Sequence, residues 1–88
     1  MMNKSLRILL LYMLTRKIIG AKHMPEYRIV KSVLKNQKEK MFDKEYKKII
    51  NEGLIIRLKK RTGKGSDWHV SINPRKIKEI MKKVNKNG

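Results

Sequence analysis

The chain has 88 residues and contains 24 Lys and Arg residues against 7 Asp and Glu residues, which gives a formal charge of +17. Its apolar content of 40% is well above that of a disordered basic tail, so a folded core must coexist with a strongly basic surface. Cysteine is absent, which excludes a disulfide framework, a thiolate nucleophile and any cysteine-based zinc or iron–sulfur site. The length predicts a single domain over residues 1–88.

The first predicted element is a helix over about residues 5–19, with Ser5 as its N-cap and Gly20 as its C-terminal stop. Its apolar residues cover one face at helical spacing and spread onto the opposite face. A helix that is apolar nearly all round must be covered on both sides. Two interpretations are open: the helix lies in the centre of the core, or it forms a homodimer surface through Ile8, Leu11 and Tyr12.

The same segment does not predict a membrane span. Its uninterrupted apolar run over residues 8–14 is far shorter than the roughly 20 residues that cross a bilayer. The run is followed by Thr15, Arg16 and Lys17 rather than by the small residues of a signal-peptide cleavage site. We therefore expect an intracellular, cytoplasmic protein with no membrane partner.

Two further helices are expected in the middle of the chain. Pro25 suits the first turn of a helix over about residues 25–36, because its missing N–H group would be unpaired there anyway. A third helix is predicted over about residues 42–52, with Gly53 as a left-handed C-cap. Helical spacing gives this helix a buried stripe that consists of Phe42, Tyr46, Ile49 and Ile50.

A β-hairpin is predicted over about residues 54–73, where apolar residues recur at every second position around a turn with two glycines. Centring the hairpin on Gly63 places three apolar pairs on one face, namely Leu54 with Ile72, Ile56 with Val70, and Leu58 with Trp68. Aromatic residues among cations can stack on unpaired bases. This register, however, predicts that Trp68 packs in the core.

The last predicted element is a helix over about residues 74–84. Asn73 and Pro74 are typical of an N-cap and a first-turn proline. The apolar stripe of this helix is a second candidate for the homodimer surface and consists of Ile77, Ile80, Met81 and Val84.

One segment and the order of the elements point to a known family. In residues 49–57, Ile-Ile-Asn-Glu-Gly-Leu-Ile-Ile-Arg, a helix end, a glycine and the entry into a strand follow one another. This segment resembles the end of the recognition helix and the start of the wing in winged helix-turn-helix DNA-binding domains, and residues 62–66 and 68–72 are similar to the wing tip and its returning strand. The resemblance implies an α+β, mostly helical fold: a winged helix with a three-helix core, a β-hairpin wing and an additional C-terminal helix. It also implies a short strand before the second helix, for which only residues 22–24 are available.

The resemblance implies double-stranded DNA as the partner, and a nucleoid-associated transcriptional regulator that acts as a homodimer on a specific site. In such domains the N-terminal part of the third helix enters the major groove, and a basic wing makes a second contact. We expect Lys44 and Lys47 to face base edges. The candidate DNA-binding residues are Lys40, Asp43, Lys44, Lys47, Lys48, Asn51, Arg57, Lys59, Arg61 and Lys64.

Each of these residues also has a simpler explanation. A lysine on the third helix is consistent with a solvated surface, Asp43 with a helix cap, and the wing cations with an edge ribbon charged against aggregation. The charge also fits a weakly sequence-specific, architectural nucleic-acid-coating protein or a basic RNA-binding domain. The sequence shows no catalytic arrangement and no metal-ligand spacing around His23 and His69, so neither an enzyme nor a cofactor is expected.

Overall fold

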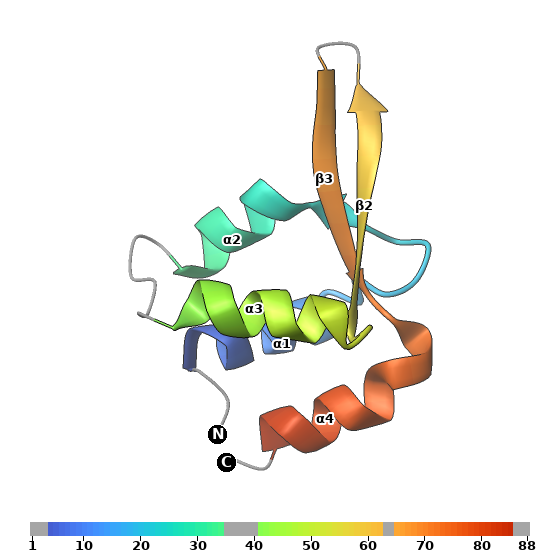
Figure 1. Ribbon diagram of the computed structural model, residues 1–88. Helices are drawn as coiled ribbons and strands as arrows, with labels where there is room; N and C mark the ends of the chain where they lie inside the picture. The colour runs from blue at the N-terminus through green and yellow to red at the C-terminus, as the bar shows by residue number, and fades with distance from the viewer. Residues whose placement is uncertain (1–3, 35–40, 63–64, 86–88) are drawn as a thin grey trace.

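The computed structural model describes residues 4–34, 41–62 and 65–85. Within these ranges, four α-helices and a three-stranded antiparallel sheet make a small α+β fold, in the order α1 (Lys4–Thr15), β1 (Met24–Pro25), α2 (Glu26–Leu34), α3 (Phe42–Asn51), β2 (Ile55–Thr62), β3 (Gly65–Ile72), a 3-10 turn (Pro74–Lys76) and α4 (Ile77–Asn85). The strands lie in the order β1-β3-β2. The β2–β3 hairpin projects from one side of the helices, and α4 lies on the opposite side (Figure 1).

Helix α1 forms the centre of the core. It contacts α2, α3, α4 and β3, so neighbours within the same chain cover its apolar sides. Of the two interpretations of this helix, this is the one that places it in the centre of the core. Ser5 is not the N-cap, because Lys4 before it is already helical. The Ser5 side chain is buried. Ile8 stays 43% exposed, while Leu11 and Tyr12 are half-buried. Four α1 residues are at most 1% exposed: Leu6, Leu9, Leu10 and Met13.

Helix α1 is shorter than predicted, because the chain turns away at Lys17 and not at Gly20. Lys17 has a φ of 55°, and the next amide, that of Ile18, donates to the carbonyl of Met13 at 2.9 Å, as in a Schellman motif. Ile18 is fully buried, and its carbonyl accepts from the amide of Ile72 at 2.9 Å. Burial and strand-like pairing of Ile18 therefore end the helix before the glycine.

The second helix begins at Glu26, one residue later than predicted, because Pro25 belongs to β1. In β1, Met24 pairs with Val70 and Pro25 pairs with His69. A proline is tolerated here because β1 lies at the edge of the sheet. The short strand expected before the second helix is thus present, and it overlaps the expected range at Met24. The predicted end of the helix near residue 36 lies outside the described residues.

Helix α3 and its C-terminal glycine are confirmed. Phe42 and Ile49 are buried, and Tyr46 and Ile50 are half-buried, so the predicted stripe faces the protein. Gly53 has a φ of 80°, the left-handed conformation that ends a helix most easily when no side chain is present.

The hairpin is present, but its predicted register is wrong by one residue. Thr62 pairs with Gly65, so two residues join the strands, whereas the prediction centred the hairpin on Gly63. Two-residue connections are the commonest in hairpins because their twist matches that of the strands. Farther along the ribbon, the pairs are Ile55 with Ile72, Arg57 with Val70, and Lys59 with Trp68.

This shift changes which side chains the core receives, because a slip of one residue turns a strand over. Leu54 and Ile55 are both buried at 1% exposure, whereas Ile56, predicted to lie in the core, is 37% exposed. Trp68 was also predicted to lie in the core, but it is 41% exposed. The prediction that Trp68 is a core residue is therefore wrong.

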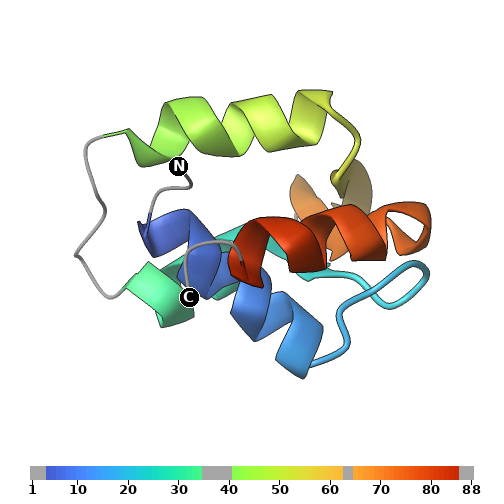
Figure 2. The same ribbon diagram turned by 90° about the horizontal axis from the view of Figure 1, so that it is seen from below.

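The C-terminal helix is confirmed, and it packs on α1 (Figure 2). The side-chain oxygen of Asn73 accepts from the amide two residues further on at 3.0 Å, and its amide group donates to the carbonyl of Gly53 at 2.8 Å. Ile80 and Val84 are 0% and 2% exposed, so these parts of the predicted homodimer surface lie inside the chain itself. Met81, by contrast, is 47% exposed.

The two left-handed helix ends lead to opposite predictions for stability. In Gly53→Ala the new methyl group meets nothing within 4 Å, so backbone strain alone should destabilise the protein by about 1 kcal/mol. Lys17→Gly relieves a lysine held at a φ of 55° and should stabilise the protein by about 0.5 kcal/mol. Urea unfolding measures both changes, and a reversal of either sign would contradict this account of the helix ends.

Candidate nucleic-acid interface

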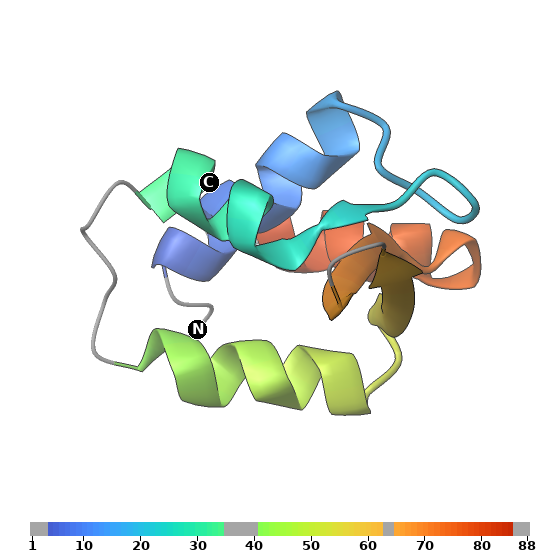
Figure 3. The same ribbon diagram turned by 90° about the horizontal axis from the view of Figure 1, so that it is seen from above.

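A groove of about 410 Å³ lies between α2, α3 and β2. Seen from above, the hairpin stands near the C-terminal end of α3, and α2 runs beside α3 (Figure 3). Because α1 packs against both α2 and α3, the groove opens on the side from which the hairpin projects. Aliphatic and aromatic side chains line it together with charged side chains of both signs. Its lining residues are Glu26, Tyr27, Val30, Phe42, Asp43, Tyr46, Lys47, Ile50 and Arg57.

The predicted DNA-binding residues of α3 are spread around its exposed surface. Asp43 and Lys47 line the groove. Lys44 and Asn51 are exposed and face away from the core, since successive helical residues are turned by about 100°. The same rotation carries Lys48, also exposed, toward the side remote from α2. Lys47 is therefore the α3 lysine that belongs to the groove, and Lys48 belongs to a different part of the surface.

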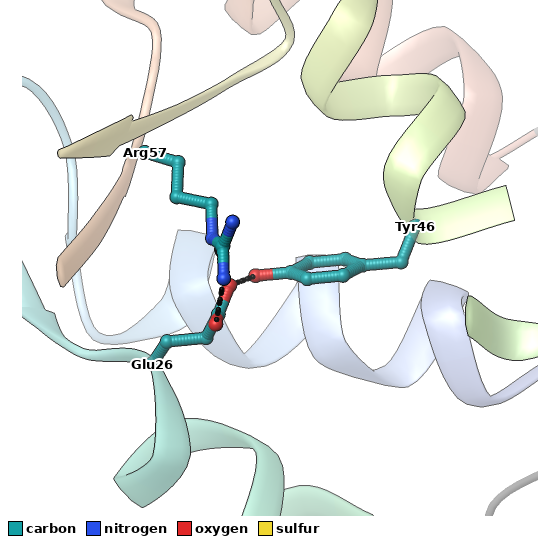
Figure 4. Close-up of polar contacts among 3 residues, drawn as sticks. All are labelled: Glu26, Tyr46 and Arg57. Carbon is teal, nitrogen blue, oxygen red and sulfur yellow. Dashed lines mark hydrogen bonds and ion pairs between the residues drawn. The ribbon is translucent and has the colours of Figure 1, made fainter. Parts of the chain in front are cut away.

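One carboxylate joins the three walls of the groove (Figure 4). Glu26 of α2 accepts a hydrogen bond from the hydroxyl of Tyr46 of α3 at 2.6 Å. The same carboxylate accepts from Nε and from a terminal nitrogen of Arg57 of β2, at 2.9 and 3.0 Å. A bidentate arginine–carboxylate pair fixes orientation as well as distance. Glu26 thus sets the position of the hairpin relative to α2 and α3.

Burial and hydrogen bonding shift the pKa values of the partners of Glu26 upward. Burial, followed by the hydrogen bond to Glu26, raises the pKa of Tyr46 well above its usual value, so its phenol remains a neutral donor. The hydrogen bond to Glu26 also raises the pKa of Arg57. Because Glu26 neutralises this guanidinium locally, Arg57 adds less free positive charge to the surface than its position in the hairpin suggests.

One face of the hairpin combines cations with an exposed tryptophan. Arg57, Lys59 and Arg61 alternate along β2 and therefore share this face, which we call the hairpin face, with Trp68 of β3. The guanidinium carbon of Arg57 lies over the indole, 4.1 Å from the ring centroid, and Nζ of Lys59 lies 5.8 Å from it. Because Arg57 also lines the groove, the groove and the hairpin face are continuous.

The structure therefore brings part of the predicted set together. Asp43, Lys47 and Arg57 surround the groove, and Lys59 and Arg61 extend the surface along the hairpin face. Lys44 and Asn51 lie on the adjoining outer side of α3, and Lys48 lies farther away. Lys40 and Lys64 lie outside the described residues.

Sequence reasoning missed three residues of this surface. Tyr46 and Trp68 were assigned to the core, and Glu26 was given no role. A signal for Glu26 was available, because it is the only acidic residue before Glu39 in a strongly basic segment. A lone acid among cations is a natural counter-charge for one of them.

Two histidines make a contact that the sequence did not predict. The Nδ1 atoms of His23 and His69 are 2.8 Å apart, and the rings meet edge to face. A hydrogen bond between these atoms requires one of the nitrogens to carry no proton. Burial, followed by the proximity of His23 and Lys60, lowers the pKa of His69. The pair links β3 to the segment just before β1.

Across residues 4–34, 41–62 and 65–85, no cluster of three His, Cys, Asp or Glu residues could hold a metal ion. In the same ranges, no helix has the length and apolar content needed to cross a bilayer. Comparison with protein-family models, curated proteins and solved structures finds no match to this chain. Function is therefore inferred from the geometry of the groove and the hairpin face.

Removing the Glu26 carboxylate should destabilise the protein. Glu26→Ala leaves the half-buried Tyr46 hydroxyl without its acceptor and Arg57 without its counter-charge, so we expect a loss of about 1–3 kcal/mol. Arg57→Ala should cost about 1 kcal/mol or less because the ion pair is partly exposed. Urea unfolding of the single and double variants gives the coupling between the two side chains.

The matched control is Glu52→Ala, which removes an exposed acid at the end of α3 and should change stability by less than about 0.5 kcal/mol. A coupling of zero between Glu26 and Arg57, or equal effects of Glu26→Ala and Glu52→Ala, would show that the network does not hold the hairpin.

Proposed function

We propose that this chain binds double-stranded DNA as a winged helix, with α3 as the recognition helix and the β2–β3 hairpin as the wing. The observation that carries the proposal is that Lys47 of α3 and Arg57 of β2 line the same groove. The helix and the hairpin thus place exposed cations on either side of one groove, Lys47 on α3 and Lys59 and Arg61 along β2. A short strand precedes α2, as the winged-helix resemblance implies.

In this proposal the N-terminal half of α3 enters the major groove. Lys44 and Lys47 donate to guanine O6 and N7 or to nearby phosphates, and Asp43 accepts from a cytosine amino group. Lys59 and Arg61 of the hairpin contact the adjacent phosphate backbone or the minor groove. The role of Arg57 is to position the hairpin, because its guanidinium is already paired with Glu26.

The net charge favours a second candidate, a protein that coats DNA with little sequence preference. A charge of +17 supplies affinity through counterion release, which requires no contact with a base.

A regulator of this size is proposed to act as a homodimer. Ile80 and Val84 are buried, which leaves Ile8 of α1 and Met81 of α4 as the exposed apolar residues on two helices that pack together. A two-fold dimer places its recognition helices about 34 Å apart, which corresponds to one turn of DNA.

Lys47→Ala should weaken binding to duplex DNA, whereas Lys82→Ala should not. Lys82 is an exposed lysine of α4, on the side of the molecule opposite the hairpin (Figure 1). We expect the first variant to lose about fivefold or more in affinity, and the second to stay within about twofold. Fluorescence anisotropy of a labelled duplex at several salt concentrations measures both, and equal losses would contradict the proposed surface.

Selection of bound duplexes from a random pool separates the two candidate functions. A regulator should prefer its selected site over random duplex by about 10³-fold or more, and Lys47→Ala should relax that preference if Lys47 reads a base. A coating protein would show a steep salt dependence with almost no preference. Tighter binding to duplex RNA than to duplex DNA would contradict both candidates.

A further inference from the structure

Trp68 is an exposed aromatic residue on a projecting hairpin. It is 41% exposed, although a tryptophan is among the side chains that gain most from burial. It lies on the hairpin face, beside Lys59 and Arg61, so its surroundings are cationic rather than apolar. An indole in this setting suits a ligand that offers both a flat π-face and negative charge.

The indole is held in place by Arg57. The guanidinium of Arg57 stacks over its ring at 4.1 Å from the centroid. Arg57 in turn is fixed by the two hydrogen bonds to Glu26, whose side chain is only 17% exposed. The ring is therefore supported through Arg57 and Glu26 by helix α2, and it loses little conformational freedom when a ligand stacks on it.

We propose that Trp68 stacks on an unpaired base of a nucleic-acid strand, while Lys59 and Arg61 hold the phosphates next to that base. Stacking on aromatic side chains inside a positively charged groove is the general means of binding single-stranded nucleic acid. A paired base within a duplex has both faces covered by its neighbours, so the ligand is a base at a single-stranded end, gap or mismatch. The inference rests on the proposed function only in that α3 binds the adjoining duplex.

Trp68 is the only tryptophan of the chain, so its emission reports directly on this contact. The probes are a blunt DNA duplex and the same duplex with a short single-stranded overhang, compared at equal salt. We expect the overhang duplex to bind about fivefold or more tightly and to quench the emission of Trp68 more strongly than the blunt duplex does.

The variants are measured by anisotropy of the labelled DNA. Trp68→Leu should abolish the preference for the overhang, measured as the ratio of the two affinities, and Trp68→Phe should retain part of the preference because a ring remains. Lys59→Ala should reduce binding of the overhang duplex more than Lys60→Ala does. These two lysines are exposed neighbours on β2. Lys60, however, points to the opposite face of the hairpin, where Asp67 is its partner in the strand register. Circular dichroism confirms that each variant is folded. If Trp68→Leu does not fold, Trp68→Phe and the comparison of Lys59→Ala with Lys60→Ala test the stacking site instead.

The outcomes separate this inference from the proposed function. Equal affinity of the wild-type protein for the two duplexes, or an unchanged preference in the Trp68 variants, overturns the stacking site and leaves duplex binding intact. Binding of the overhang duplex with quenching of Trp68, without binding of the blunt duplex, supports the stacking site and overturns the proposed function. Failure to bind any of these nucleic acids overturns both.

Discussion

The proposed binding surface depends on the carboxylate of Glu26. In a chain with a charge of +17, the cations of α3 and of the hairpin repel one another where the two elements meet. Glu26 supplies the opposite charge at that point and bonds to both elements, through Tyr46 on α3 and Arg57 on β2. Its side chain is 17% exposed, so water and salt screen this attraction less than they screen the repulsion between exposed lysines. The charge density of the surface can therefore be high without forcing the hairpin away from α3.

The central position of α1 explains both how the core is packed and why α3 is exposed. Helix α1 lies centrally and is covered by α2, α3, α4 and β3, so an 88-residue chain fills its interior with one helix that is apolar on most sides. This leaves α3 with only one buried stripe and a free outer surface. Helix α4 closes the core on the side away from the hairpin (Figure 1). Core formation and the proposed polyanion binding therefore use different sides of the molecule.

The elements could be predicted from local patterns, whereas the surface could not. The stripe of α3 and the left-handed Gly53 followed from spacing and from the freedom of glycine. The prediction of the hairpin register was wrong because Leu54, Ile55 and Ile56 are three consecutive apolar residues. Alternation then cannot decide which face of the strand is buried. Only the pairing of Thr62 with Gly65 decides it. Trp68 shares its β3 face with the buried Val70 and Ile72, and it is exposed because it lies farther along the hairpin, opposite Lys59. The contacts of Glu26 span 20 and 31 residues, so no local pattern contains them. Lys17 replaces Gly20 as the end of α1 because burial of Ile18 outweighs the backbone strain of a lysine with a φ of 55°.

The central claim is that α3, the groove and the hairpin face bind one nucleic acid together. Amide chemical-shift mapping by NMR during titration with a short DNA duplex tests it most directly, because it locates the contact residue by residue without any substitution. We expect the shifts to cluster on α3 around Lys47 and along β2 and β3, while the exposed residues of α4 stay unchanged. Shifts concentrated on α4, or on α3 without the hairpin, would contradict it.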